Sequence, residues 1–176
     1  MKSLNMIAGT ALLCLLVTGC ASGVTREAPD TPEKAHLSAG KQVAEVSVIL
    51  TEVAKEKVVD NLKFDPGELK NHVQRAMDAR SLINPAARGR IPVLTVEVKD
   101  FRVRSNFSAV MFGFMAGADS ITGDIVIKDA GGAEIDRFEV TVSYALGGLA
   151  GGQDSARMGW LYEKFAEEAV KELTRE

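Results

Sequence analysis

The sequence is poor in the side chains that most enzymes use for nucleophilic, acid–base or metal chemistry. Its 176 residues include two cysteines, two histidines and one tryptophan, and aromatic residues make up 6% of the chain. No Gly-x-Ser-x-Gly segment places a serine nucleophile on a strand-to-helix turn. The apolar stretch at residues 6–17 is too short for a membrane-spanning helix, which needs about 20 residues. These features favour a non-catalytic protein without a resident cofactor or metal ion.

The charge balance is mildly acidic, with 24 Asp and Glu residues against 21 Lys and Arg residues and a net charge of −3. Nucleic-acid-binding domains carry a concentrated basic patch, and segments that bind anionic lipid carry clusters of lysine and arginine. The sequence contains neither pattern, so we expect no nucleic-acid partner.

The first twenty residues have the organisation of a bacterial lipoprotein signal. Lys2 supplies a positive charge, and residues 6–17 form a short apolar core. Residues 17–20 read Val-Thr-Gly-Cys and resemble the lipobox of bacterial lipoprotein precursors. The resemblance implies cleavage before Cys20 and attachment of lipid to Cys20. Ala21, where an aspartate would favour the inner membrane in enterobacteria, favours the periplasmic face of the outer membrane.

This signal divides the chain into three parts. Residues 1–19 form a signal peptide that is removed together with Cys14, so that the mature domain has no free thiol. Residues 20–41 are rich in proline, glycine and small residues and predict a lipidated flexible tether with an r.m.s. length of about 25 Å. Residues 42–176 are expected to form one domain that stands off the membrane surface.

Hydrophobic periodicity within residues 42–176 predicts four strands and two helices. The strands are expected at residues 43–51, 92–104, 119–128 and 138–144, and the helices at residues 66–84 and 155–173. Residues 54–63 are ambiguous between a loop and a short helical turn. The predicted fold is a two-layer α+β sandwich, in the order β-α-β-β-β-α, with both helices on one face of a mixed four-stranded sheet.

Three local signals support these elements. Asp65-Pro66-Gly67-Glu68 combines an N-cap acceptor with proline at the first helical position and predicts a helix start. The buried positions of the second strand change parity near residues 99–100, which predicts a β-bulge. Residues 129–133 read Asp-Ala-Gly-Gly-Ala and predict a hairpin turn.

The segment from Phe107 to Ala118 is apolar at both odd and even positions. It predicts either a strand buried on both faces or an exposed patch that binds a partner, an apolar ligand or a membrane. The residues that would form this patch are Phe107, Val110, Met111, Phe112, Phe114 and Met115.

Other candidate features are interpreted as structural. The glycine-rich residues 147–152 lack the Gly-Lys-Ser/Thr ending of a phosphate loop and are expected to form a connector. We expect His36 and His72 to be non-ligands and Trp160 to be half-buried. A glycosidase would need two carboxylates at a defined separation. The carboxylates close to unusual backbone are Asp100, Asp119, Asp124 and Asp129, for which solvated structural roles are favoured.

The chain from Asn106 onwards resembles bacterial lipoproteins of the domain of unknown function 4410 family. The similar features are residues 110–117, residues 125–129, the glycine-rich connector and the charged closing helix. The family has no established activity, so the resemblance implies no catalytic residues. We expect a membrane-anchored lipoprotein that binds an envelope protein. The alternatives are a protein that binds lipid or another apolar ligand through residues 107–118, and an envelope hydrolase.

Overall fold

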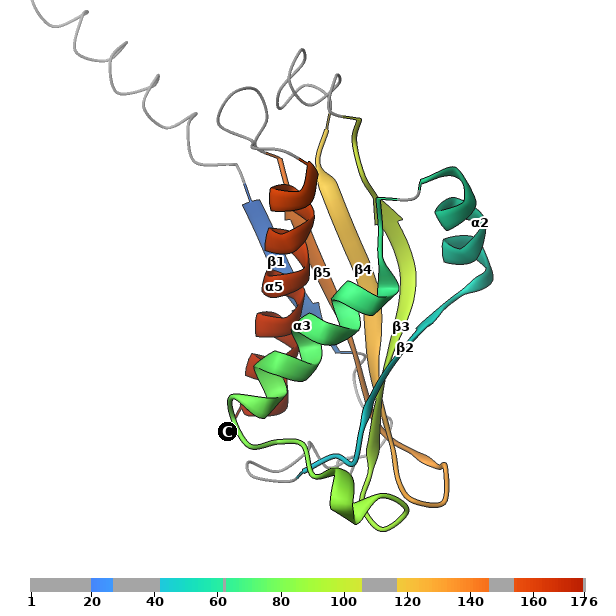
Figure 1. The fold of residues 1–176 in the computed structure, drawn as a ribbon, viewed down its shortest axis with the longest axis vertical. Coiled ribbons are helices and arrows are strands. Elements are labelled where there is room, and N and C mark those ends of the chain that lie inside the picture. The colour runs from blue at the N-terminus through green and yellow to red at the C-terminus, as the bar shows by residue number, and fades with distance from the viewer. Residues whose placement is uncertain (1–19, 27–41, 62, 106–116, 146–153, 176) are drawn as a thin grey trace, which may run out of the picture.

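The computed structural model describes residues 20–26, 42–61, 63–105, 117–145 and 154–175. These residues form a five-stranded mixed sheet together with three α-helices, as Figure 1 shows. The predicted α+β class is therefore confirmed. The predicted numbers of four strands and two helices were wrong. The strand at residues 20–25 was not recognised, and residues 54–63, which were left open between a loop and a helical turn, lie largely in a helix at residues 52–60.

The sheet has the strand order β1-β5-β4-β3-β2. Its strands are β1 (Cys20–Thr25), β2 (Val46–Leu50), β3 (Val93–Arg102), β4 (Asp119–Lys128) and β5 (Glu134–Tyr144). The helices are α2 (Glu52–Asp60), α3 (Pro66–Asp78) and α5 (Asp154–Leu173), with a 3-10 turn at Pro85–Ala87. β2 is parallel to β3, whereas the other neighbouring strands are antiparallel. The parallel pair requires a crossover, which α2 and α3 provide.

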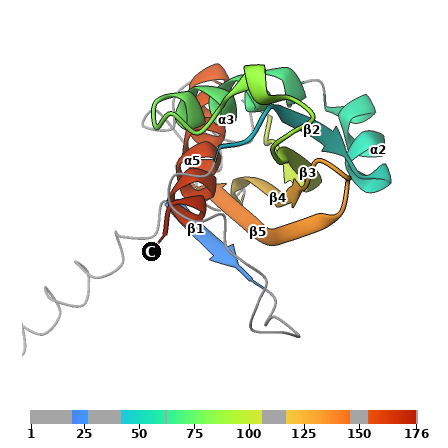
Figure 2. The same ribbon diagram turned by 90° about the horizontal axis from the view of Figure 1, so that it is seen from below.

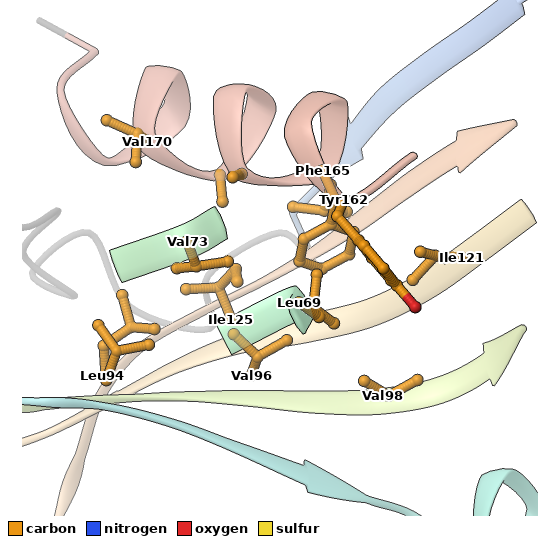
Figure 3. Packing of buried hydrophobic residues seen from close by; sticks show 14 of the residues in the cluster. Leu69, Val73, Leu94, Val96, Val98, Ile121, Ile125, Tyr162, Phe165 and Val170 are labelled. Carbon is orange, nitrogen blue, oxygen red and sulfur yellow. The ribbon is translucent and has the colours of Figure 1, made fainter. Parts of the chain in front are cut away.

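Helices α3 and α5 cover the same face of the sheet, and α2 lies beyond the β2–β3 edge (Figure 2). Leu69 and Val73 of α3 lie among Phe165 of α5 and Val96 and Ile125 of the sheet (Figure 3). The predicted apolar face of the last helix is buried, with Met158, Leu161, Tyr162, Phe165, Ala169 and Leu173 in the core. The helical periodicity of the apolar residues therefore predicted the buried face of this helix correctly.

The first predicted helix begins as expected but ends earlier. The Asp65 carboxylate accepts hydrogen bonds from the amide nitrogens of Gly67 at 2.7 Å and Glu68 at 3.3 Å. The helix ends at Asp78 instead of near residue 84. Residues 82–84 instead bond to Val43, which donates to the Leu82 carbonyl at 2.8 Å. This contact draws the chain out of the helical path.

The hairpin and the bulge were both predicted correctly. Asp129 accepts hydrogen bonds from the amides of Gly131 and Ala133 in the turn between β4 and β5. The β3–β4 register shifts between Val98 and Asp100. This shift moves Phe101 onto the buried face that Leu94, Val96 and Val98 occupy in the first half of β3.

Gly123 lies opposite the bulge, where a side chain does not fit. A Cβ atom there would lie 3.0 Å from the Glu97 carbonyl oxygen and 3.3 Å from the Val98 Cα atom. We expect Gly123→Ala to lower the free energy of unfolding by about 1–3 kcal/mol, because backbone on a paired strand must shift. Urea denaturation measures the change. The control is Gly159→Ala in α5, where a Cβ atom meets no atom within 4 Å and the helix gains about 0.5–1 kcal/mol. Equal effects of the two variants would contradict the prediction.

The predicted flexible tether differs from the structure in its first part. Cys20–Thr25 is not a tether but an edge strand paired antiparallel to β5. Ser22 donates a hydrogen bond to the Glu168 carboxylate of α5 at 3.0 Å. The contacts of this strand are with residues more than 100 positions away, so local composition did not reveal it. Residues 27–41, with His36, lie outside the described residues.

Arg26, which follows β1, fastens this strand to the rest of the domain. Its guanidinium donates to Glu172 of α5 and to Asp136 of β5, both at 2.6 Å. The same group lies over the Phe138 ring, 4.6 Å from the ring centroid. Charged and aromatic contacts therefore join β1, β5 and α5.

Candidate functional site

Cys20 lies at one end of the sheet, at the same level as the beginning or end of several other elements. In the register it is opposite Tyr144, the last residue of β5, and Tyr144 is also opposite Asp119, the first residue of β4. Figure 1 places the start of α5 and the end of β3 at this end of the sheet. We call this region, formed by residues 20–21, 102–105, 117–119, 144–145 and 154–160 with Lys63, the Cys20 end.

A buried ion cluster holds the Cys20 end together. The Asp119 carboxylate accepts hydrogen bonds from Arg104 Nη2 at 3.0 Å and from Arg157 Nε at 2.8 Å. It also accepts one from the Arg104 backbone amide at 2.6 Å. The three residues are 4% or less exposed. One carboxylate therefore contacts two buried guanidinium groups. In such a cluster, removal of one charged partner is strongly destabilising.

The arginines of this cluster also bind backbone carbonyl groups. Arg104 donates to the carbonyl oxygens of Gly117 at 2.7 Å, Tyr144 at 3.1 Å and Ala145 at 3.4 Å. Arg157 donates to the Arg104 carbonyl at 3.2 Å. The cluster therefore fixes the end of β3, the start of β4, the end of β5 and the start of α5 relative to one another.

The cluster lowers the pKa of Asp119. Burial acts to raise this pKa, but hydrogen bonds from Arg104 and the charges of both arginines outweigh it, so that the net direction is downward. The folded protein then binds this proton less readily than the unfolded chain does. We therefore expect the stabilisation by Asp119 to be complete above about pH 4, the ordinary range of an aspartate, and to be lost as pH falls through the folded-state pKa.

A carboxyl NMR titration of the folded protein tests this expectation directly. The Asp119 signal should titrate below the ordinary aspartate range. A midpoint at or above that range would contradict the proposed effect of the two arginines. Urea denaturation from pH 5 downwards should show the corresponding loss of unfolding free energy.

The predicted apolar patch falls in a segment outside the described residues, as does the glycine-rich connector at 147–152. The patch residues concerned are Phe107, Val110, Met111, Phe112, Phe114 and Met115. The structure does place the flanks of both segments, because Ser105, Gly117, Ala145 and Asp154 belong to the Cys20 end.

The other candidate carboxylates form ion pairs or accept hydrogen bonds in a turn. Asp100 pairs with Lys57 on the surface. Asp124 pairs with Lys99 at 3.2 Å and with Arg137 at 2.7 Å on the sheet face opposite α3 and α5. The pKa of Lys99 is raised, chiefly by its hydrogen bond to Glu139. These carboxylates, with Asp129 in its turn, have structural partners, as predicted. The expectation that they are solvated was wrong for Asp119 and Asp124, which are buried against basic side chains.

A surface groove of about 540 Å³ runs between α3 and α5. Its lining residues are His72, Arg75, Ala76, Ala79, Arg80, Glu163, Ala166, Glu167 and Val170. The pKa of His72 is lowered, first by partial burial and then by the charge of Arg75, so that the imidazole is neutral at pH 7. The lining of the groove thus combines three alanines with charged side chains of both signs.

Sequence reasoning missed Arg104 and Arg157 of the buried cluster. Arg157 lies one helical turn before Leu161, on the apolar face of α5, and a charged residue at such a position signals a buried partner. Arg104 lies two residues after the end of β3 and offers no comparable pattern. Trp160 is half-buried, as predicted, with its ring centroid 5.1 Å from that of Tyr144.

The described residues contain neither a metal-binding cluster nor a helix suited to crossing a membrane. No group of three or more His, Cys, Asp and Glu side chains in this part of the chain is arranged to hold a metal ion. None of the described helices combines the length and the hydropathy that a membrane crossing requires.

Two solved structures of PelC dodecamers from Paraburkholderia phytofirmans, one of them a point variant, are similar to the chain. They have TM-scores of 0.46 (the variant) and 0.45 at 12% and 14% identity, and the similarity covers 89% of this chain and 99% of theirs. A minor lipoprotein from Acinetobacter baumannii has a TM-score of 0.37 at 12% identity, covering 74% of this chain and 92% of its own. No curated protein matches the chain.

The sequence profile described as domain of unknown function (DUF4410) matches residues 32–148. This match covers more than half of the chain, from the segment before β2 to the residues just after β5. It agrees with the resemblance noted from residues 110–117 and 125–129. The protein therefore belongs to the DUF4410 family.

Proposed function

We propose that this protein is a lipid-anchored envelope lipoprotein whose domain is a non-catalytic binding module for another envelope protein. Cys20 carries the lipid, and the domain lies on the periplasmic face of the outer membrane. The membership of the DUF4410 family and the Val-Thr-Gly-Cys sequence before the domain support this assignment.

The proposal that the domain is non-catalytic rests on one observation, which is that the candidate carboxylates form ion pairs. Asp119 is enclosed by two arginines, Asp124 lies between Lys99 and Arg137, and Asp100 pairs with Lys57. General acid–base catalysis needs groups positioned to exchange protons with a substrate. These side chains instead join neighbouring elements of the fold, which favours a domain built to present surfaces.

The lipid anchor is tested with the full chain expressed in a bacterial host supplied with a labelled fatty acid. We expect the label on the wild-type protein, which should sediment with outer-membrane fractions. Cys20→Ala should lose the label and accumulate as the precursor, whereas Cys14→Ala should behave as wild type. Equal labelling of wild type and Cys20→Ala would overturn the anchor.

The binding role is tested by photo-crosslinking in living cells. A photoreactive residue replaces Thr141, which is exposed on the sheet face opposite the helices, or Ala79 in the groove between α3 and α5. The control position is Gly131 in the β4–β5 turn. We expect one envelope protein, identified by mass spectrometry, to crosslink at Thr141 or Ala79 and not at Gly131. Failure of both positions would contradict the binding role.

A second candidate function is binding of lipid or another apolar ligand through residues 107–118. The apolar composition of this segment favours it, because exposed apolar patches mark interaction sites. Native mass spectrometry of the purified protein is the test. A co-purifying apolar ligand that is lost in Phe112→Ser would support this function, and a spectrum of the protein alone would oppose it.

A further inference from the structure

We propose that the Cys20 end of the domain rests directly on the lipid bilayer, so that the domain itself contacts the membrane to which it is anchored. This proposal rests on the lipidation of Cys20 proposed above. It adds an orientation of the domain and a contact surface, whose occupant is the lipid headgroup region.

The anchor point has no spacer between it and the sheet. Cys20 is the first residue of β1 and lies opposite Tyr144. Neighbouring strands are about 4.8 Å apart, so the backbone of Asp119, two strands away, lies about 10 Å from Cys20. A flexible tether of about 20 residues would instead give an r.m.s. separation of about 25 Å. Acyl chains on Cys20 therefore bring the whole end close to the bilayer.

Strand β1 is also too well fastened to act as a spacer itself. Detaching it would break the hydrogen bond between Ser22 and Glu168 and both ion pairs of Arg26. It would also expose Val24, which packs against the core. Because these contacts resist detachment, Cys20 stays at the end of the sheet and does not move away on a free strand.

The charged residues at the Cys20 end are mainly basic. The charged residues are Lys63, Arg102, Arg104 and Arg157 against Asp119 and Asp154. This end is therefore cationic, whereas the whole chain has a net charge of −3. Lys63 and Arg102 are exposed, and the Arg102 guanidinium lies against Gly117. Each such basic group near an anionic bilayer contributes about 1 kcal/mol of attraction.

An aromatic pair completes the surface. The rings of Tyr144 and Trp160 are 5.1 Å apart, and both residues are half-buried. Tyrosine and tryptophan are enriched at the headgroup level of membranes, because each joins an apolar ring to a polar group. The pair therefore has the composition expected beside a lipid anchor.

The test uses the full lipidated chain in vesicles of phosphatidylethanolamine and phosphatidylglycerol. The mature domain has no other free thiol, so Ser105→Cys at the Cys20 end and Gly131→Cys in the β4–β5 turn can each carry one environment-sensitive fluorophore. We expect headgroup-level quenching by spin-labelled lipid to be about threefold or more stronger at residue 105 than at residue 131, which lies about 30 Å along β4. Arg102→Glu should reduce the quenching at residue 105, whereas Arg80→Glu, just after α3, should not.

The two proposals fail in distinguishable ways. The mass of the Cys20 peptide from the same sample reports lipidation, and its absence would overturn the anchor. If Cys20 is lipidated but the labels at residues 105 and 131 are quenched equally, the proposed contact is overturned while the anchor stands. Stronger quenching at residue 131 would show the reverse orientation and would also overturn it.

Discussion

Asp119→Asn is expected to lower the free energy of unfolding by about 3–5 kcal/mol, the cost of removing one partner from a buried charge cluster. The side chain is fully buried and accepts hydrogen bonds from Arg104 and Arg157. The asparagine amide has nearly the same shape but no charge, and its NH2 group would face donors. Two buried guanidinium groups would then lose the carboxylate charge that they share. Because small domains are stable by only about 5–15 kcal/mol, urea denaturation should show a large shift.

Two further variants make this prediction specific. Asp100→Asn removes a carboxylate of the exposed pair with Lys57, and it should cost about 0.5 kcal/mol or less. In the second control, Arg157→Met is added to Asp119→Asn. The double variant removes one of the two guanidinium groups that Asp119 binds and should restore part of the lost stability. An Asp119→Asn variant as stable as Asp100→Asn would show that the cluster does not hold this end together.

Arg26→Gln is expected to lower the free energy of unfolding by about 2–3 kcal/mol. This is somewhat less than the loss of a partner from a fully buried pair would cost, because the Arg26 side chain is 22% exposed. Its partners Asp136 and Glu172 have side chains only 6% and 9% exposed. Without the arginine, two carboxylates would lie near each other with little solvent. Hydrogen exchange should also become faster at the amides of β1, because the variant releases the end of this strand.

The matched control for Arg26 is Arg175→Gln. Arg175 pairs with the same carboxylate, Glu172, at 3.5 Å, but its side chain is 75% exposed. Its removal should cost less than about 0.5 kcal/mol and leave exchange in β1 unchanged. If both variants had the same effect, β1 would not depend on Arg26. A released β1 would also act as a spacer, so Arg26→Gln should weaken the quenching of a label at residue 105.

The local pattern of residues predicted the elements whose partners are close in sequence. The helix start at Asp65 depends on amides two and three residues away, and the turn at Asp129 depends on Gly131 and Ala133. The bulge after Val98 appeared as a change in parity, because burial alternates along a strand. The burial of the α5 core face follows equally from its period, since one side of that helix is apolar.

Two features that depend on distant partners and lack a local pattern were not predicted. β1 consists of small and polar residues, and its stability comes from pairing with β5 and from Arg26, whose partners are more than 100 positions away. The end of α3 was also misjudged, because residues 82–84 pair with Val43. In both cases the decisive hydrogen bonds join segments that a sequence window does not contain.

By itself, the sequence determined the α+β class, the position of the hairpin and bulge, and Cys20 as the expected lipidation site. Only the tertiary structure brought Asp119, Arg104 and Arg157 together, and only it placed Cys20 at the start of a strand instead of on a flexible tether. The physical reason is the range of the interactions. Periodicity and capping act within a few residues, whereas buried ion pairs and edge-strand pairing need the complete fold to create them.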